Sequence, residues 1–177
     1  LEPLPPTGSP KGSSSDPMGT YAPHAYAQLH ACVKVVQADL KSSAGQTKLH
    51  GLLAKTDVLL TSFRPSALRK LGMDWKSLHA QFPSLIMVSI VGAKGAAAEI
   101  PGHDLTYLAA HGLVTGLHLP ATLFADMAGS ALAVEAVLKS LWQRARPGRG
   151  HGKGVFHEVA LEDAAAYLAL PRHWGLT

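Results

Sequence analysis

The sequence predicts an α/β domain in which helices flank a parallel sheet. Two apolar segments, residues 57–62 and 85–91, have the length and composition of strands, and helix-like segments follow each of them. Strands that alternate with helices at such spacings are typical of βαβ units, which build parallel sheets. The first segment is almost continuously apolar, so we expect a strand that is buried on both faces.

The composition of the 177-residue chain indicates a globular protein, with 47% hydrophobic and 16% charged residues. Its apolar runs are shorter than the ~20 residues that a membrane span requires, and no export leader opens the chain. Cys32 is the single cysteine, which excludes an internal disulfide and fits a reducing compartment. We therefore expect a cytoplasmic protein with no membrane partner.

The formal net charge is +4, and the densest basic segment is residues 144–153. This segment carries no aromatic residues on which bases could stack and lacks the spacing of a phosphate-binding loop. We therefore expect a solvated loop and no nucleic-acid partner. The positive surplus still suits a polyanionic, nucleotide-bearing ligand.

The first 22 residues are rich in Pro, Gly and Ser, which predicts a flexible tail before a core formed by residues 23–177. Residues 34–40 are predicted to form a short strand. Ser42 or Ser43 can cap the helix that follows, and apolar residues at helical spacing define one face of this helix: Leu49, Leu52 and Leu53.

Further along, Arg64 and Pro65 are predicted to begin a short helix that Gly72 ends. Residues 75–81 form a second short helix, which Pro83 stops. The turns after the strands at 57–62 and 85–91 lie at the carboxyl ends of these strands, where open α/β sheets bind ligands.

The C-terminal half is predicted to be mainly helical. Residues 104–117 form one helix, and Asp126 precedes a long amphipathic helix that ends at Pro147 and Gly148. Residues 155–160 are then predicted to form a last strand and residues 161–170 a last helix.

Several of these segments together resemble the family III CoA-transferases. The motifs are ADLKS at 38–42, DVLLTSFRP at 57–65, LGMDW at 71–75, PGHDLTY at 101–107, ADMAG at 125–129 and GRG at 148–150. The family includes formyl-CoA and carnitine CoA-transferases and α-methylacyl-CoA racemases. The resemblance runs from about residue 29 to the end and implies the middle part of the Rossmann-like large domain. The fold is therefore expected to be incomplete relative to the family.

Asp126 matches the catalytic aspartate of the family. The resemblance implies a CoA-transferase that moves CoA between an acyl-CoA and a carboxylic acid through an aspartyl intermediate. The alternative for this residue is a structural one, since an Asp before a helix commonly caps it.

His103 matches the histidine that the racemases pair with this aspartate. The second implied activity is therefore a 2-methylacyl-CoA racemase, in which His103 and Asp126 act as an acid/base pair. The alternative is a surface or cap histidine, and Asp104 is expected to be the N-cap of its own helix. The spacing of His103, His111 and His118 does not fit a zinc site, so no metal is expected.

The resemblance also implies where coenzyme A binds as a substrate. The matching positions follow the two strands and are Ser62, Phe63, Arg64, Lys70, Val91, Gly92, Ala93 and Lys94. The structural alternatives are solvated helix charges for Arg64 and Lys70, core packing for Phe63, and a turn with positive φ for Gly92.

Family members form dimers, so the expected partners are acyl-CoA, a small carboxylic acid and a second copy of the chain. A hypothesis of another class is that the chain is a non-catalytic remnant or fragment of the family. It is favoured because the family's first βα unit and second domain are not found in this sequence.

Overall fold

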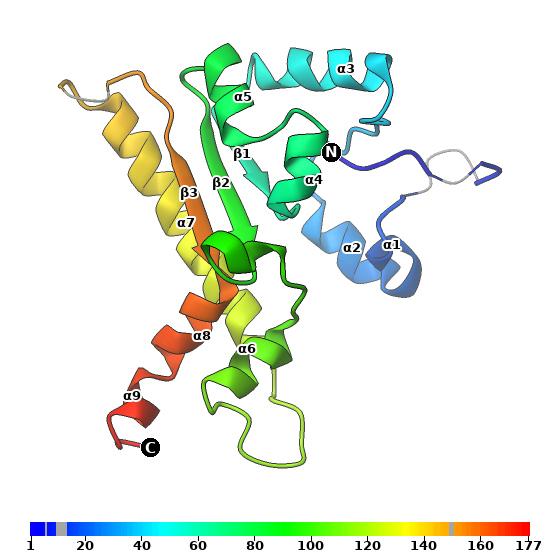
Figure 1. Cartoon of the computed structure of the whole chain (residues 1–177). Helices are drawn as coiled ribbons and strands as arrows, with labels where there is room; N and C mark the ends of the chain where they lie inside the picture. Colours follow the sequence, from blue (N-terminus) through cyan, green and yellow to red (C-terminus); the bar gives the residue numbers. More distant parts are fainter. Residues whose placement is uncertain (6, 10–13, 149–150) are drawn as a thin grey trace. The chain divides into compact units, whose positions relative to one another are not determined.

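The structure is a computed structural model that describes residues 1–5, 7–9, 14–148 and 151–177. It divides into two compact units, Leu1–Lys55 and Thr56–Thr177, which are considered separately (Figure 1). Arg149 and Gly150 of the GRG motif and part of the proposed tail lie outside the described residues. No helix in the described part of the chain is both long enough and apolar enough to cross a membrane.

The N-terminal unit consists of short helices and irregular chain, with the helices α1 (Met18–Tyr21), α2 (Pro23–Leu29) and α3 (Ser43–Leu53). The Glu2 carboxylate accepts hydrogen bonds from Tyr26 Oη at 2.5 Å and Ser14 Oγ at 3.1 Å. These bonds tie the start of the chain to the α1–α2 region. The mobility expected for residues 1–22 stays a prediction.

The predicted strand at residues 34–40 is wrong. Only Gln37 pairs there, in an isolated parallel bridge to Glu2. A strand requires a neighbour along its length, and the described residues of this unit supply a single paired position.

The predicted cap of α3 is confirmed at Ser42, whose Oγ accepts a hydrogen bond from Gly45 N–H at 3.0 Å. Leu49 and Leu53 are buried, as their spacing predicts, whereas Leu52 is 40% exposed. The apolar face of α3 is therefore narrower than expected.

The second unit contains a three-stranded parallel sheet in the order β1-β2-β3, which confirms the predicted class. The strands are β1 (Val58–Thr61), β2 (Ile86–Val91) and β3 (Phe156–Ala160). β2 pairs with both neighbours, from Val58↔Ile86 on one side to Val91↔Ala160 on the other. β1 lies at an edge and Leu60 is 55% exposed, so its predicted burial on both faces is wrong.

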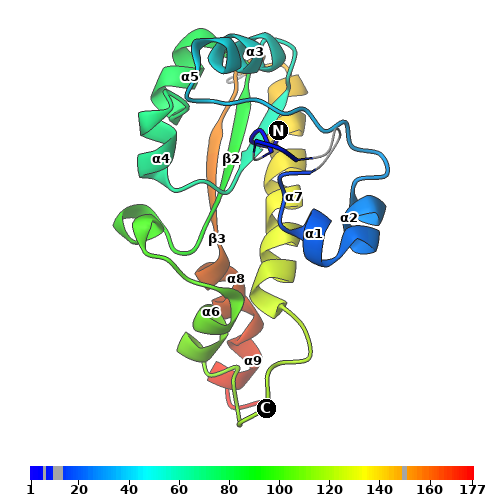
Figure 2. The ribbon, with the colours of Figure 1, turned by 90° about the vertical axis from the view of Figure 1, so that its right-hand side faces the viewer.

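Helices cover both faces of this sheet (Figure 2). Two short helices lie on one face: α4 (Pro65–Lys70) and α5 (Trp75–Gln81). Pro65 occupies the first turn of α4, Gly72 follows the helix with φ +68°, and the Asp74 side chain caps α5. These short helices therefore begin and end where the sequence predicts.

The other face of the sheet is covered by α7 (Phe124–Ala145). The core between them contains Ile86 and Val88 from β2, Ala133 from α7 and Val159 from β3. Because α7 returns the chain to the start of β3, it runs antiparallel to the strands. Its N-terminus therefore lies toward the carboxyl edge of the sheet.

The remaining helices are η1 (Gly95–Glu99), α6 (Asp104–Ala110), α8 (Leu161–Leu168) and α9 (Leu170–His173). α6 ends seven residues earlier than predicted because Gly112 adopts φ +70°, which breaks the helical path. The last predicted helix is divided at Ala169, which separates α8 from α9. A small core joins α6, α7 and α8 and contains Tyr107, Leu108, Ala125 and Ala165.

Gly154 is a packing constraint on the sheet. Its N–H donates to Pro83 O at 2.8 Å, and a Cβ at this position would overlap the backbone of Leu85, just before β2. We predict that Gly154→Ala lowers the free energy of unfolding of the second unit by about 1–3 kcal/mol, because the backbone must shift to relieve the overlap. Urea unfolding followed by tryptophan fluorescence measures this, since all three tryptophans lie at or beyond residue 75.

The matched control is Gly116→Ala, since an added Cβ there meets open space and the glycine is exposed. It should change the free energy of unfolding by less than about 0.5 kcal/mol. Equal effects of the two substitutions would contradict the packing constraint at Gly154.

Candidate active site

The loop that follows β2 is bonded to the start of α8, the helix that follows β3, at the carboxyl edge of the sheet. The backbone N–H of Glu162, in the first turn of α8, donates to Gly92 O at 2.9 Å. Lys94 forms an ion pair with Asp163 on the same helix. These bonds set the position of the loop that follows β2.

Asp104 links α6 to the start of α7. Its side chain is buried, with 5% of its surface exposed, and its Oδ1 accepts a hydrogen bond from Asp126 N–H at 3.0 Å. The bond satisfies an amide in the first turn of α7 that has no partner within the helix. Asp104 thereby fixes where Asp126 sits.

Both predictions of an aspartate at an N-cap position are wrong. Leu123 is the N-cap of α7, so Asp126 lies inside the first turn. His103 occupies the N-cap position of α6, and Asp104 is the first helical residue, with its carboxylate directed to α7. The cap alternative for Asp126 is therefore wrong, and the catalytic role of this residue stays a prediction.

Asp126 lies in an environment that disfavours its charge. The side chain is partly buried, and burial raises the pKa of the Asp126 carboxyl, as does the negative charge of Asp104. The positive charge of His103 acts in the opposite direction and lowers this pKa. The two predicted catalytic residues are therefore within electrostatic reach of each other.

His103 is exposed at the N-terminus of α6, and its backbone N–H donates to Thr106 Oγ1 at 3.3 Å. The side chain is not enclosed by the core. The position is thus accessible from solvent, as in the alternative of a surface or cap histidine.

Tyr107 is a residue of the site that the sequence argument missed. It is buried, and burial followed by the charges of Asp126 and Glu162 raises the pKa of its hydroxyl. A Cβ at either Gly92 or Gly102 would overlap this hydroxyl. The predicted positive φ of Gly92 is wrong, because this glycine instead allows the close approach of Tyr107. The sequence contains a signal for this contact, because Gly92 and Gly102 precede a tyrosine that lies one helical turn after His103.

The predicted coenzyme-contact residues after β1 lie in an open turn. Ser62, Phe63 and Arg64 are exposed between β1 and α4. Phe63 is 51% exposed, so the alternative of core packing is wrong. Lys70 is exposed at the far end of α4, and the length of this helix separates it from the turn by about 9 Å. The structure therefore does not bring Lys70 close to Ser62, Phe63 and Arg64.

The predicted residues after β2 differ in what they can offer a ligand. Val91 is buried against Ala98 and Ala160, so only its backbone is available. Gly92 and Ala93 are half-buried, and the Lys94 ammonium is already paired with Asp163. A ligand phosphate would have to compete with that carboxylate for Lys94.

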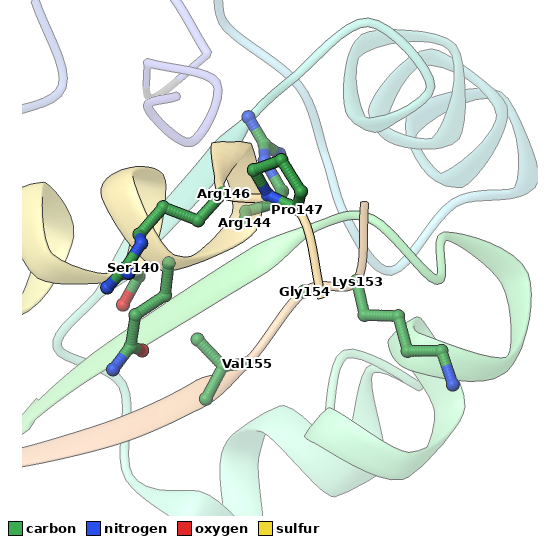
Figure 3. A pocket seen from close by; sticks show the side chains of 8 residues that line it. Ser140, Arg144, Arg146, Pro147, Lys153, Gly154 and Val155 are labelled. Atoms are coloured by element: carbon green, nitrogen blue, oxygen red, sulfur yellow. The ribbon is translucent and has the colours of Figure 1, made fainter. Parts of the chain in front are cut away.

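Two cavities, of about 400 and 200 Å³, are lined by residues other than Asp126 and His103. The larger lies at the opposite edge of the sheet, before β3, and Arg144, Arg146 and Lys153 line it (Figure 3). Arg144 is bound to Asp57 and Ser84 O, Arg146 stacks on Trp142, and Lys153 extends away from both arginines. These cations do not converge on one point. Within the described ranges, no group of three His, Cys, Asp or Glu side chains could hold a metal ion.

The fold and the residues at the carboxyl edge agree with one known family. The sequence matches the model of CoA-transferase family III over residues 9–173. The chain therefore belongs to CoA-transferase family III, as its motifs predict.

Relatives in this family include proteins named for two different reactions. The chain is 40% identical over 85 residues to a cinnamoyl-CoA:phenyllactate CoA-transferase of Clostridium sporogenes. This match covers 47% of this chain and 21% of that protein. It is 34% identical to the alpha-methylacyl-CoA racemase of Mus musculus, over 74% of this chain and 36% of that protein.

A crystal structure of a CAIB/BAIF family protein from Brucella suis has the same fold, with a TM-score of 0.71 and 30% sequence identity. The similarity covers 79% of this chain and 38% of that one. The chain thus spans well under half the length of these relatives.

The electrostatic contacts of Asp126 give opposite expectations for two substitutions. Asp104→Asn keeps an oxygen that can accept Asp126 N–H but removes a negative charge, so the pKa of Asp126 should fall. His103→Gln removes the positive charge, so this pKa should rise. Titration of the Asp126 carboxyl carbon by NMR measures both shifts. Shifts in the same direction would show that these residues do not surround Asp126 as described.

Proposed function

We propose that the carboxyl edge of this sheet binds acyl-CoA and that Asp126 transfers CoA from it to a carboxylic acid. The observation that carries the proposal is the placement of Asp126 in the first turn of the 22-residue helix α7, with its backbone held by Asp104. Free amide N–H groups and the dipole at a helix N-terminus can stabilise the oxyanion that the reaction develops on the thioester carbonyl oxygen.

The proposed reaction begins with attack of an Asp126 carboxylate oxygen on the thioester carbon. The C–S bond breaks, and CoA leaves as a thiolate with an acyl-aspartyl anhydride remaining. The thiolate then attacks the aspartyl carbonyl, which releases the first acid and leaves an aspartyl-CoA thioester. Attack by the acceptor carboxylate and return of the thiolate to the new acyl group complete the exchange and restore Asp126.

The raised pKa of Asp126 has two consequences for this chemistry. Only the ionised carboxylate attacks, so the rate should fall as the pH drops through the pKa of Asp126. When ionised, a carboxylate of raised pKa is a stronger nucleophile than an ordinary one. The nearby His103 moderates the shift and keeps the charged form accessible.

The open turns after β1 and β2 support the binding part of the proposal. Arg64 is exposed where the chain leaves β1, and its guanidinium suits a phosphate of CoA. Gly92 and Ala93 leave backbone close to the surface after β2. Coenzyme A enters as a substrate, and the homodimer remains a prediction.

The effect of the His103 charge on the pKa of Asp126 favours a second candidate, racemisation of a 2-methylacyl-CoA. One of the two groups would remove the α-proton of the thioester, and the other would return a proton to the opposite face. No covalent adduct forms in this case.

Mass spectrometry of the chain after incubation with acyl-CoA tests the proposal. We expect an adduct on Asp126 that hydroxylamine removes, and Asp126→Asn should abolish it because an amide is not a nucleophile. Glu135→Gln, an exposed carboxylate on the same helix, is the matched control and should leave the adduct unchanged.

The other outcomes have defined meanings. Exchange of the α-proton in deuterated water that requires His103 and Asp126, without an adduct, would favour the racemase. Neither adduct nor exchange would favour the non-catalytic remnant.

A further inference from the structure

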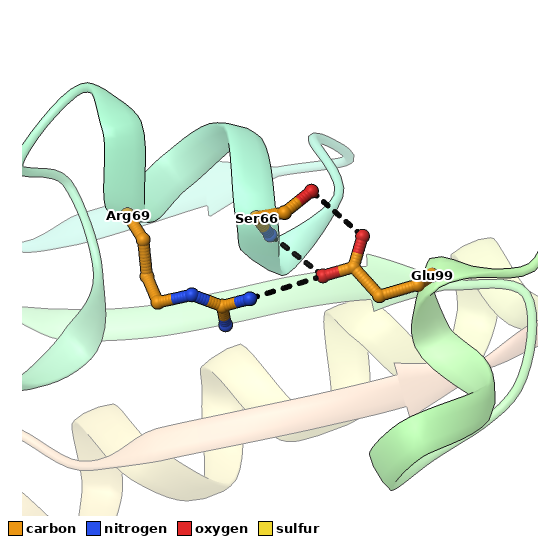
Figure 4. A network of polar contacts seen from close by, with 3 residues as sticks. All are labelled: Ser66, Arg69 and Glu99. Carbon is orange, nitrogen blue, oxygen red and sulfur yellow. Dashed lines mark hydrogen bonds and ion pairs between the residues drawn. The ribbon is translucent and has the colours of Figure 1, made fainter.

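The turn after β1 and the loop after β2 are joined by one carboxylate, that of Glu99. Glu99 ends η1, in the loop between β2 and α6, and its oxygens reach the first turn of α4 (Figure 4). Oε1 accepts the Ser66 N–H at 2.7 Å, and Oε2 accepts the Ser66 hydroxyl at 2.7 Å. Arg69 Nη2 approaches Oε1 at 3.4 Å.

The two hydrogen bonds to Ser66 fix both the orientation of the Glu99 carboxylate and its distance from α4. Ser66 is the second residue of α4, so its N–H has no partner within the helix and points toward the incoming carboxylate. The two oxygens of Glu99 are each used by a different donor of the same residue. Ser66 hydrogen bonding, with Arg69 as a lesser contributor, lowers the pKa of Glu99, so the carboxylate is charged at neutral pH.

The loop that carries Glu99 is fastened on its other side by different bonds. Gly92 O and Lys94 are bound to the start of α8, as described above. Gly95 N–H, in η1, also donates to Glu158 Oε2 of β3 at 3.2 Å. The contact with Ser66 therefore connects α4 to a loop that is otherwise anchored to α8 and β3. His103 follows Glu99 by four residues in the same connection.

We propose that Glu99 is a positioning residue that holds the Ser62–Arg64 turn at a fixed spacing from the loop after β2, so that both can contact one CoA molecule. The inference rests on the proposed function, because these turns are the predicted CoA contacts. Glu99 itself is directed at Ser66 and does not touch the ligand.

The Glu99 and Arg69 side chains are 38% and 62% exposed, so their contact should contribute little to global stability. Loss of the carboxylate would leave the Ser66 donors to water. The main effect of losing this carboxylate is then expected in the position of the turn after β1 relative to the loop after β2. This expectation distinguishes a positioning role from a general structural role.

The test compares Glu99→Ala, Glu99→Gln and the control Glu135→Ala in the full 177-residue chain, with CoA as the probe. Calorimetry should show affinity for CoA roughly tenfold weaker in Glu99→Ala. Glu99→Gln should recover most of the affinity, because its amide oxygen still accepts the Ser66 N–H and the hydroxyl can turn to accept from the amide. Glu135→Ala should bind as the unsubstituted chain does.

Hydrogen exchange by mass spectrometry gives a second readout. In Glu99→Ala, exchange should become faster in residues 62–68 and 92–103, whereas β2 and β3 should be unchanged. Faster exchange throughout the unit would indicate a merely structural role and overturn the proposal, as would unchanged exchange in both segments. If Glu99→Ala does not fold, Ser66→Ala, which removes one of the two bonds, must show a smaller effect in the same segments.

These outcomes are separable from failure of the proposed function. If the unsubstituted chain does not bind CoA, the proposed function fails, and the exchange data alone decide whether Glu99 holds the two turns. If the chain binds CoA and Glu99→Ala binds it equally well, only the positioning role is overturned.

Discussion

The parallel pairing of β1, β2 and β3 is the constraint on which the rest of the second unit depends. Because all three strands run in one direction, the connections that leave them emerge at the same edge. The return helix α7 must run the opposite way, which brings its first turn toward that edge. The turns after β1 and β2 and the first turn of α7 are thereby directed toward that edge, although they lie far apart in the sequence. No single motif could achieve this on its own.

Local contacts then determine the positions of individual side chains at the carboxyl edge of the sheet. Asp104 determines the position of Asp126, and the glycines at 92 and 102 admit the hydroxyl of Tyr107. Burial beside Asp104 makes the Asp126 carboxyl less acidic, and His103 opposes that change. The site thus contains a carboxylate whose charge depends on its immediate neighbours, as acyl-transfer and proton-transfer chemistry both require. Membership of CoA-transferase family III is consistent with either reaction.

The sequence predicts regular elements well where the signal is local. Pro65, Gly72 and Ser42 mark helix ends correctly, because backbone geometry and side-chain capping act within a few residues. The prediction fails where the element depends on pairing with a distant segment. Residues 34–40 have the composition of a strand, but only Gln37 is paired with another segment. The same holds for the site, since the contact between Asp104 and Asp126 spans 22 residues and depends on the packing of α6 against α7.

The central claim is that CoA binds at the carboxyl edge of the sheet, beside Asp126. Mapping backbone amide shifts by two-dimensional NMR during addition of CoA tests it most directly. The account predicts that the largest shifts occur at Phe63, Gly92, His103 and Asp126. Shifts confined to the basic cavity at the opposite edge, around Arg146 and Lys153, would contradict it.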